Sequence, residues 1–346
     1  MLKVSIVGCG LIVRKKHLPA FLKLKPKVDV VALCDLNEIA AKDLAKAFHI
    51  KKVYTDFSKM LEEVKPDIVD ISTPPSTHAK LSTEAIQNNC HVLLEKPMAL
   101  SVTDCDAIID AAKRHDRKVC VIHNQIFNPT FIKARNIVLR GKLGNFLGMR
   151  MLLSTPSDYM TSINTHWVHK LPGGALGETG PHAVYLSLAF LNNIRDVYVH
   201  AQKQIPEFSW SKFEDFRIDL LADNGISSII LLYSGNQWQA EIEIFASRGI
   251  LKVDLENHTL LRYNRPKLNP FFIAGSTLSS ICQAIKEIIF DSLQYISGKT
   301  FDPHFIIISK FIDSILNDTE APITLEEAKE VVRVMEMLVE SLEGKV

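Results

Sequence analysis

The chain has 346 residues, which is too long for one ordinary hydrophobic core and about the length of two domains. Its residues are 47% hydrophobic and 23% charged, as is typical of a globular protein. The 40 basic and 39 acidic residues give a formal net charge of +1 and form no long block of one sign, so we expect no nucleic-acid partner.

The first 35 residues have the pattern of a dinucleotide-binding site. Residues 2–7 predict a strand, Gly8-Cys9-Gly10 a tight turn, and residues 11–24 a helix that Pro19 interrupts. A second apolar run, residues 30–33, leads to Asp35. An ordinary glycine turn is the alternative, but the strand before, the helix after and the acid at the end of the next strand favour the dinucleotide site.

Each part of this pattern has a physical role. Gly8 permits the turn, Gly10 lets the backbone approach a pyrophosphate, and Leu11 and Ile12 begin a helix whose free N–H groups attract phosphate. Asp35 would accept hydrogen bonds from the ribose hydroxyls and repel a 2′-phosphate, and the following Leu36-Asn37 offers no arginine for that phosphate. We therefore expect NAD to be preferred to NADP. One departure is Val13, which occupies the third small position of the pattern.

Helices and strands alternate up to residue 122. Helical patterns cover residues 39–48, 57–64 and 76–88, and further strands begin at Val53 and cover residues 68–71, 91–94 and 119–122. Six strands separated by helices predict a doubly wound parallel sheet, a Rossmann domain over residues 1–122. Such sheets bind ligands at the carboxyl ends of their strands, where Thr73-Pro74 and Glu95-Lys96-Pro97 lie.

The pattern changes after residue 122 and predicts an α+β domain over residues 123–346. Helices are expected at 128–139, 175–191, 277–296, 305–316 and 325–342, and strands at 146–154, 197–202, 218–222, 228–232 and 237–245. In the last strand apolar and polar residues alternate, which favours a mainly antiparallel sheet of meander type. The predicted helices suffice for one face of this sheet, so we expect a homodimer or homotetramer, although a polar face could instead be hydrated.

Cysteine usage and apolar runs indicate a cytoplasmic protein. The six cysteines are scattered without a CxxC pair, as expected of buried thiols in a reducing compartment. The first strand begins at residue 2 and leaves no room for a signal peptide. The longest apolar stretch near the C-terminus, residues 278–296, contains Lys286, Glu287 and Asp291, so we expect no membrane span.

Taken together, the motifs resemble those of the glucose-fructose oxidoreductase, inositol dehydrogenase and MocA (Gfo/Idh/MocA) family of nicotinamide-dependent enzymes. The resemblance covers nearly the whole chain in the right order. Glu95-Lys96-Pro97 after a strand, followed some eighty residues later by a cluster of glycines and His182, is more specific than the glycine turn. The matching positions are Gly8 to Gly10, Asp35, Thr73-Pro74, His78, Glu95 to Pro97, Asn124, Gly173 to Leu176, Glu178, Gly180, His182, Gly249 to Asp254 and Thr324 to Ala328.

The resemblance implies the roles of these residues. Lys96 and His182 would lie beside the nicotinamide and the reacting carbon of the substrate, with Glu178 as the third catalytic residue. Cofactor contacts would come from Gly8, Gly10, Leu11, Ile12, Asp35, Thr73, Pro74, His78, Glu95, Lys96 and Asn124, and substrate contacts from Lys96, Asn124, Trp167, Glu178, His182 and Tyr185. Glu178 and Tyr185 stand where the family usually has aspartates, and residues 255–298 form a longer and more apolar stretch than the family has.

The side chains themselves suit this chemistry. Glu178 and His182 are four residues apart and would project from one face of a helix, within hydrogen-bonding reach. Removing hydride from a secondary alcohol requires a base with a pKa near 7, which histidine supplies, and a lysine ammonium would stabilise the developing alkoxide. Judged alone, each could be a surface lysine, a structural histidine or a solvated acid. His166 and His169 lack a cysteine or acid at ligand spacing, so we expect no metal site.

Three functions compete on these observations. The leading hypothesis is an NAD(P)-dependent oxidoreductase acting on a secondary alcohol or ketone of a sugar, polyol or sugar derivative. A catalytically silent NAD(P)-binding sensor is the second, although such a protein would not need Lys96 and His182. The third is a redox-neutral NAD-dependent glycosidase. The sequence identifies neither the substrate nor the direction of the reaction.

Overall fold

The structure is a computed structural model that describes residues 1–264, 266–296 and 302–344. It divides into two compact units, one of Met1–Asn124 with Asp302–Arg333 and the other of Gln125–Phe301 with Val334–Val346. The domain boundaries expected from the sequence, 1–122 and 123–346, stay a prediction. The predicted boundary between residues 122 and 123 lies within two residues of the observed boundary between Asn124 and Gln125. The prediction does not include the return of residues 302–333 to the first unit.

The first unit contains a six-stranded parallel sheet in the order β3-β2-β1-β4-β5-β6. This is the strand order of a dinucleotide-binding Rossmann fold, and it confirms the predicted doubly wound parallel sheet. Its strands are β1 (Leu2–Val7), β2 (Val28–Cys34), β3 (Lys52–Tyr54), β4 (Ile68–Ile71), β5 (His91–Leu94) and β6 (Val119–Val121).

The helix after the first turn differs from an ordinary α-helix. It begins at Leu11, passes through a π-helical turn (η1, Val13–His17) and continues as α1 (Leu18–Lys23), with Pro19 in the first turn of α1. Pro19, which has no backbone N–H, lies just after the π turn, close to the interruption expected from the sequence. The π turn buries both Val13 and His17.

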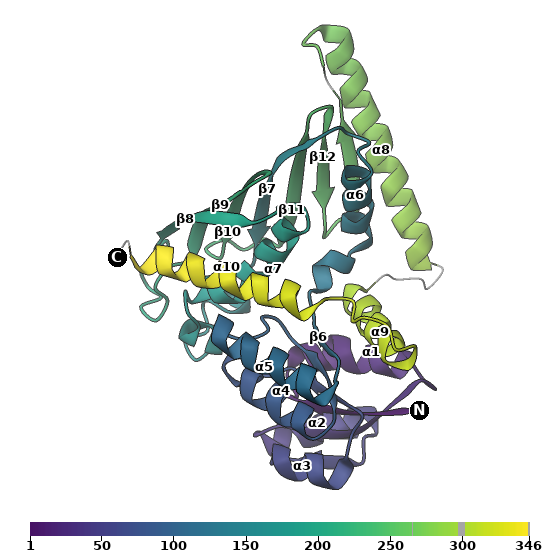
Figure 1. Ribbon diagram of the computed structural model, residues 1–346. Coiled ribbons are helices and arrows are strands. Elements are labelled where there is room, and N and C mark those ends of the chain that lie inside the picture. The colour runs from purple at the N-terminus through teal and green to yellow at the C-terminus, as the bar shows by residue number, and fades with distance from the viewer. Residues whose placement is uncertain (265, 297–301, 345–346) are drawn as a thin grey trace. The chain divides into compact units, whose positions relative to one another are not determined.

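The other helices of the first unit flank the sheet (Figure 1). They are α2 (Glu38–Phe48), α3 (Phe57–Val64), the 3-10 turn η2 (Pro75–Thr77), α4 (His78–Gln87), α5 (Val102–His115) and α9 (Pro303–Leu316). Ser101 caps α5 by accepting the Asp104 N–H. Ion pairs of Lys16 with Asp302 and of Lys27 with Asp313 join α9 and its N-cap to the first β-α-β segment.

The second unit contains a seven-stranded, mostly antiparallel sheet in the order β13-β12-β11-β7-β10-β9-β8. The strands are β7 (Phe146–Ser154), β8 (Ile194–Gln202), β9 (Asp215–Ala222), β10 (Gly225–Leu232), β11 (Gln239–Ala246), β12 (Gly249–Asp254) and β13 (Thr259–Tyr263). A simple meander was the wrong expectation in one respect. β7 lies between β10 and β11 and pairs in parallel with β10, because the chain returns to it after α7, β8 and β9.

Helices of the second unit pack on this sheet (Figure 1): α6 contacts β12 and β13, and α7 contacts β7 and β10. The bounds are η3 (Asn124–Phe127), α6 (Pro129–Leu139), η4 (Ser157–Tyr159), η5 (Trp167–Lys170), α7 (Ala175–Leu188) and α8 (Pro270–Ile296). The final helix, α10 (Leu325–Glu343), has residues in both units and begins at a capping box, in which Glu327 accepts the Thr324 N–H and Thr324 accepts the Glu327 N–H. None of the helices in the described ranges is long and apolar enough to cross a membrane.

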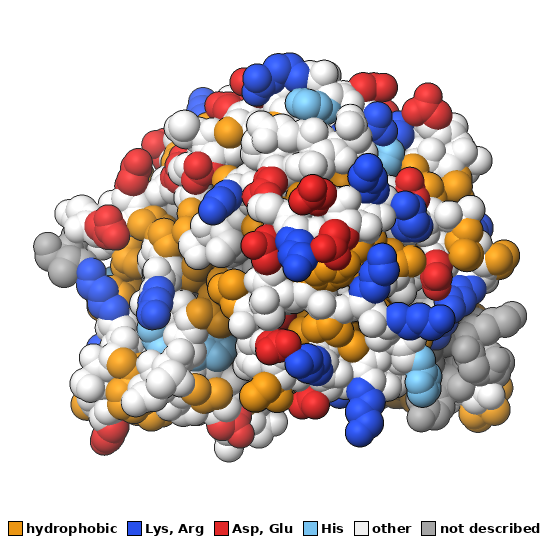
Figure 2. Space-filling model, turned by 90° about the horizontal axis from the view of Figure 1, so that it is seen from below, with side chains coloured by type: hydrophobic (Ala, Val, Ile, Leu, Met, Phe, Trp, Pro, Cys, Tyr) orange, Lys and Arg blue, Asp and Glu red, His pale blue; other side chains and the backbone are white. Residues whose placement is uncertain are grey.

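Charged side chains are mixed on the surface. On the face seen in Figure 2, basic and acidic side chains alternate without a block of one sign, in line with the near-zero net charge. On the sheet of the second unit, Glu243 of β11 forms ion pairs with Arg150 of β7 and Lys252 of β12. Part of this sheet therefore carries charged side chains that pair with one another. The expected homodimer or homotetramer stays a prediction.

Candidate active site

The two glycines of the first turn have different surroundings. Gly8 has φ +92°, and a Cβ built on it would lie well inside contact distance of the Ser72 carbonyl oxygen. Only glycine fits there, because the turn packs directly against the loop that follows β4. A Cβ on Gly10 would meet no described atom within 4 Å, and the φ of Gly10 lies outside the left-handed region. The surface above Gly10 is thus open to a ligand.

Asp35 is held at the end of β2, beside this turn. Its Oδ2 accepts the Cys9 N–H (2.7 Å) and its Oδ1 accepts the Asn37 N–H (2.8 Å). Each carboxylate oxygen can accept a second hydrogen bond, so ribose hydroxyls remain possible donors. Burial, followed by the charge of Asp35, raises the pKa of the Cys9 and Cys34 thiols to about 12, which makes both thiols unreactive at neutral pH.

His78 joins two of the predicted ligand loops. It is fully buried, with Nδ1 2.8 Å from the Pro97 carbonyl oxygen and Nε2 2.9 Å from that of Thr73. Burial lowers the pKa of His78, and a neutral imidazole carries one N–H, so one of the two carbonyls accepts it in either tautomer. The sequence placed His78 among cofactor contacts. Its buried position indicates that it holds Thr73-Pro74 against Glu95-Lys96-Pro97.

A buried charged network stabilises the loop that carries Lys96. His17 Nδ1 lies 2.8 Å from Asp70 Oδ2, and its Nε2 lies 3.1 Å from Glu95 Oε1. Burial alone would lower the pKa of His17, but the two carboxylates outweigh it and raise this pKa to about 10. Burial alone would raise the pKa of Glu95, whereas hydrogen bonding and charge from His17 lower it to about 2. His17 is therefore an imidazolium between two carboxylates.

The same network brings three possible metal-ligand atoms together. One atom each of His17, Glu95 and His304 lie within 4.8 Å of one another. Both ring nitrogens of His17 already face carboxylate oxygens, which is the arrangement of a paired imidazolium. The sequence considered only His166 and His169 for a metal. In the structure His166 Nδ1 accepts the Val168 N–H, and His169 Nε2 lies 3.1 Å from the Ile163 carbonyl oxygen.

The main chain of Lys96 is hydrogen-bonded to this network. Glu95 Oε2 accepts the Lys96 backbone N–H (3.1 Å), so the carboxylate paired with His17 also fixes the start of the loop. Glu95 and Pro97 are buried on either side, whereas Lys96 is partly exposed. The local structure thus holds the main chain at the end of β5 and leaves the Lys96 side chain accessible.

In the second unit, α7 carries the other predicted catalytic residues. His182 Nδ1 lies 2.6 Å from the Tyr185 hydroxyl oxygen, which also accepts the Gln125 N–H (3.1 Å). Tyr185 is 2% exposed, so packing fixes its ring. It stands where the family usually has an aspartate, and in this chain its hydroxyl orients His182. The side chain therefore suits a positioning role better than direct substrate contact.

Glu178 and Trp167 lie on neighbouring segments of the second unit. Glu178 Oε2 accepts the Thr179 hydroxyl proton (2.8 Å), and the expected hydrogen bond to His182 stays a prediction. Trp167 begins η5, which contacts α7, and its ring stacks on that of His166 at 5.4 Å. Asn124 begins η3, immediately before the Gln125 N–H that binds Tyr185.

The glycines around α7 explain its close packing. A Cβ on Gly177 would lie 2.7 Å from the Pro172 carbonyl oxygen, and one on Gly180 would lie 2.8 Å from the Met335 Cε. α7 therefore packs closely against the preceding loop at Gly177, where backbone blocks a larger residue, and against the flexible Met335 side chain of α10 at Gly180. This packing fixes the helix that presents Glu178 and His182.

The first unit has a dinucleotide-binding Rossmann fold and the second an α+β fold, and comparison with family models agrees with this architecture. Residues 2–123 match the oxidoreductase family with an NAD-binding Rossmann fold, and residues 131–252 match the GFO/IDH/MocA C-terminal domain. The chain belongs to the GFO/IDH/MocA family and is an NAD-binding oxidoreductase, as the motifs indicated.

Individual relatives are distant. An oxidoreductase of Formosa agariphila is 25% identical over 227 residues, covering 64% of this chain and 69% of that protein. Inositol 2-dehydrogenase of Salmonella typhimurium is 28% identical over 165 residues, covering 46% and 49%, so the match spans about half of that enzyme. The WlbA dehydrogenase of Bordetella pertussis, solved with NADH and UDP-GlcNAcA, has a TM-score of 0.80 at 18% identity and covers 100% of this chain and 96% of its own, which shows a shared fold.

Proposed function

We propose that this protein is an NAD-dependent dehydrogenase or reductase that transfers a hydride between nicotinamide and a secondary alcohol or ketone of a sugar, polyol or sugar derivative. The observation that carries this proposal is the hydrogen bond between His182 Nδ1 and the Tyr185 hydroxyl. It gives a histidine, a side chain that can take up and release a proton near neutral pH, a fixed ring orientation. The dehydrogenases among the relatives support the same substrate class.

His182 is the proposed general base in oxidation and general acid in reduction. When Nδ1–H donates to the Tyr185 oxygen, Nε2 keeps a lone pair that takes the proton of the substrate hydroxyl. Tyr185 can donate as well as accept, so it supports Nδ1 in either tautomer. The hydroxyl proton would pass to Nε2, and the hydrogen on the same carbon would leave as hydride with both electrons of its C–H bond, which would give the ketone. Bound NAD would supply the hydride acceptor.

Lys96 assists at the substrate oxygen. Its ammonium would stabilise the negative charge that develops there, an effect that grows toward the transition state. The Glu95 carboxylate and His78 hold the loop, so Lys96 needs little reorganisation when substrate binds. Glu178 is proposed to orient His182, Lys96 or both, and Trp167 and Asn124 to contact the substrate.

NAD is the proposed cofactor in preference to NADP. The open surface at Gly10, the N–H groups that follow at Leu11 and Ile12, and the fixed carboxylate of Asp35 suit a pyrophosphate and an unmodified ribose. Thr73 and Pro74 would complete the cofactor's surroundings. The exposed Leu36 beside Asp35 offers no positive charge to a 2′-phosphate.

The test is a screen of sugars, polyols and sugar nucleotides with NAD, followed by the absorbance of NADH. We expect one class of substrate to yield free NADH in proportion to the ketone formed, and NADP to react more slowly. NAD binding without hydride transfer to any substrate would favour the sensor. Cleavage of a glycosidic bond without net formation of NADH would favour the redox-neutral glycosidase. A faster reaction with NADP would contradict the cofactor assignment.

A further inference from the structure

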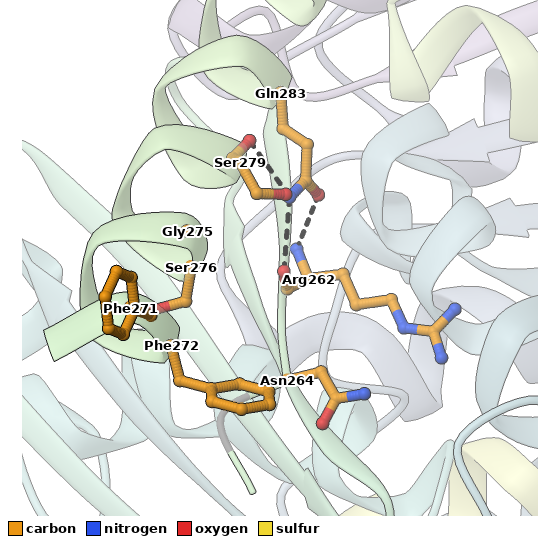
Figure 3. A pocket seen from close by; sticks show the side chains of 8 residues that line it. All are labelled: Arg262, Asn264, Phe271, Phe272, Gly275, Ser276, Ser279 and Gln283. Carbon is orange, nitrogen blue, oxygen red and sulfur yellow. Dashed lines mark hydrogen bonds between the residues drawn. The ribbon is translucent and has the colours of Figure 1, made fainter. Parts of the chain in front are cut away.

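Helix α8 is attached to its own unit by polar residues. It runs alongside β13 (Figure 1). Gln283 Oε1 accepts the Arg262 backbone N–H (2.9 Å), and Gln283 Nε2 donates to the Arg262 carbonyl oxygen (3.2 Å; Figure 3). Farther along the helix, Glu287 forms an ion pair with Lys133, and Asp291 lies within hydrogen-bonding distance of His258 Nδ1 (3.2 Å). The side of α8 that faces the sheet is thus its hydrophilic side.

The N-terminal part of α8 does not close against β13. A pocket of about 570 Å³ lies there, lined by serines and phenylalanines of α8 together with Arg262 and Asn264 (Figure 3). The N-terminal part of α8 is therefore separated from β13 by open space. An ordinary surface helix has the opposite arrangement, with its apolar side against the core.

Most apolar side chains of α8 are exposed to solvent, although Phe271 and Phe272 also line the pocket. We call the following seven exposed side chains the outward strip: Phe271, Leu278, Ile281, Ile285, Ile288, Ile289 and Ile296. Each is at least half exposed, and Phe271 and Ile296 are 86% and 80% exposed. Phe271, Leu278 and Ile285 are spaced seven residues apart. Ile281 and Ile288 lie three residues after Leu278 and Ile285 and are also seven residues apart. This is the spacing of a helix that packs lengthwise against another helix.

We propose that the outward strip binds the same strip of a second copy of this chain, forming a two-fold symmetric helix pair. A heptad seam is self-complementary, as a two-fold interface requires. Complete cover of the seven side chains would bury roughly 900 Å² per copy, close to the 800 Å² or so per partner of a standard stable interface. The inference does not depend on the proposed function.

The charges of α8 favour a protein partner over a lipid surface. Helices that lie on anionic membranes are rich in Lys and Arg. The described side chains of α8 include one cation, Lys286, against the acids Glu287 and Asp291. Both acids have polar partners within the unit, and the outward strip itself is uncharged. A second copy with the same uncharged strip is the partner that this surface fits.

The first test is the mass of the full chain in solution, measured by light scattering after size exclusion. The variant Ile281→Glu with Ile285→Glu places two charges at the middle of the strip. We expect its mass to be half that of the wild type. The matched control, Leu36→Glu with Ile39→Glu, changes two exposed side chains of the first unit and should keep the wild-type mass. An unchanged mass in the strip variant, with its circular dichroism like that of the wild type, would overturn the proposal.

The second test uses Cys282, which is exposed beside the strip, whereas the other five cysteines are buried. It lies near the middle of α8, so parallel and antiparallel two-fold pairs both bring two copies of it close together. A short bismaleimide should give a covalent dimer that Cys282→Ser abolishes. The lack of a covalent dimer would contradict the pairing. Co-sedimentation with phosphatidylcholine or phosphatidylglycerol vesicles, lost in the strip variant, would overturn it in favour of lipid.

Discussion

The two glycines of the first turn should respond in opposite ways to alanine. At Gly10 an added Cβ would meet no described atom within 4 Å, and the backbone is not left-handed. Gly10→Ala should therefore leave the free energy of unfolding unchanged or raise it by about 0.4–1 kcal/mol, through the lower entropy of the unfolded chain. The same methyl group occupies space that the cofactor pyrophosphate would approach. Losing hydrogen bonds to its charged oxygens costs about 1.5–3 kcal/mol, so the Kd for NAD should rise roughly 10- to 100-fold.

Gly8→Ala should affect folding. A non-glycine residue in the left-handed region costs about 1–2 kcal/mol. The Cβ would also overlap the Ser72 carbonyl oxygen, and forcing that loop to move costs about 1–3 kcal/mol. Together these effects predict a loss of about 2–5 kcal/mol in the free energy of unfolding. Some loss of NAD binding should accompany it, because Thr73 moves with the loop.

Urea unfolding and calorimetric titration with NAD measure both quantities on the same preparations. The reasoning is refuted if Gly10→Ala lowers stability as much as Gly8→Ala, or if it leaves NAD affinity within two-fold of the wild type. The first result would mean that the space above Gly10 is filled in solution. The second would mean that the cofactor does not approach this turn.

Three further predictions concern other residues of the site. Asp35→Asn should weaken NAD binding roughly 10-fold or more, since the single amide oxygen cannot accept both the Cys9 and the Asn37 N–H groups. The preference for NAD over NADP should become smaller. Steady-state comparison of the two cofactors measures this, and an unchanged preference would contradict the prediction. The pKa of His17 is raised to about 10 in the folded chain, against about 6.5 in the unfolded chain. Its ion pairs therefore contribute fully to the free energy of unfolding below about pH 6.5, and this contribution is lost as the pH rises toward 10. Wild-type stability in urea should fall over that interval more steeply than that of His17→Gln, and parallel pH profiles would show that His17 is not charged. Tyr185→Phe leaves His182 without its hydroxyl partner and should lower kcat roughly 10-fold with a smaller change in KM; a changed KM alone would mean that Tyr185 serves binding.

The parallel sheet of the first unit was predictable from the sequence because short apolar runs alternate with helices of the right length. The π turn was not, since Val13 and His17 fit an ordinary helix equally well in a residue pattern. The partner of Glu95 was therefore missed. A buried acid next to a required loop needs a cation nearby, but the sequence does not say that residue 17 supplies it.

In the second unit, alternation predicted most strands but not their neighbours. Period two fixes which side chains share a face, whereas the partner of a strand depends on contacts far along the chain. This is why the position of β7 between β10 and β11 was not foreseen. The strands β12 and β13 were not predicted at all. The apolar pattern of α8 indicated a helix, but the usual assumption that the apolar side faces the core is wrong for it.

The candidate site was predictable where a motif fixes residue types, as at Gly8, Asp35 and Glu95-Lys96-Pro97. The tasks of His78 and Tyr185 depend on which atoms surround them. His78 contacts two backbone carbonyls, and Tyr185 contacts a backbone N–H and the His182 ring. Main-chain partners leave no trace in the residue types of the sequence, so their positioning roles needed the structure.

The most direct test of the proposed dehydrogenase is a single-turnover measurement on His182→Ala with the substrate found in the screen. NAD affinity should stay near the wild-type value, because none of the proposed cofactor contacts is changed. The rate of NADH formation should fall roughly 10²- to 10⁴-fold, the range for losing a general acid or base. Lys96→Met should lower the rate as well, with some loss of substrate binding. A His182→Ala rate within a few-fold of the wild type would contradict the assigned proton transfer.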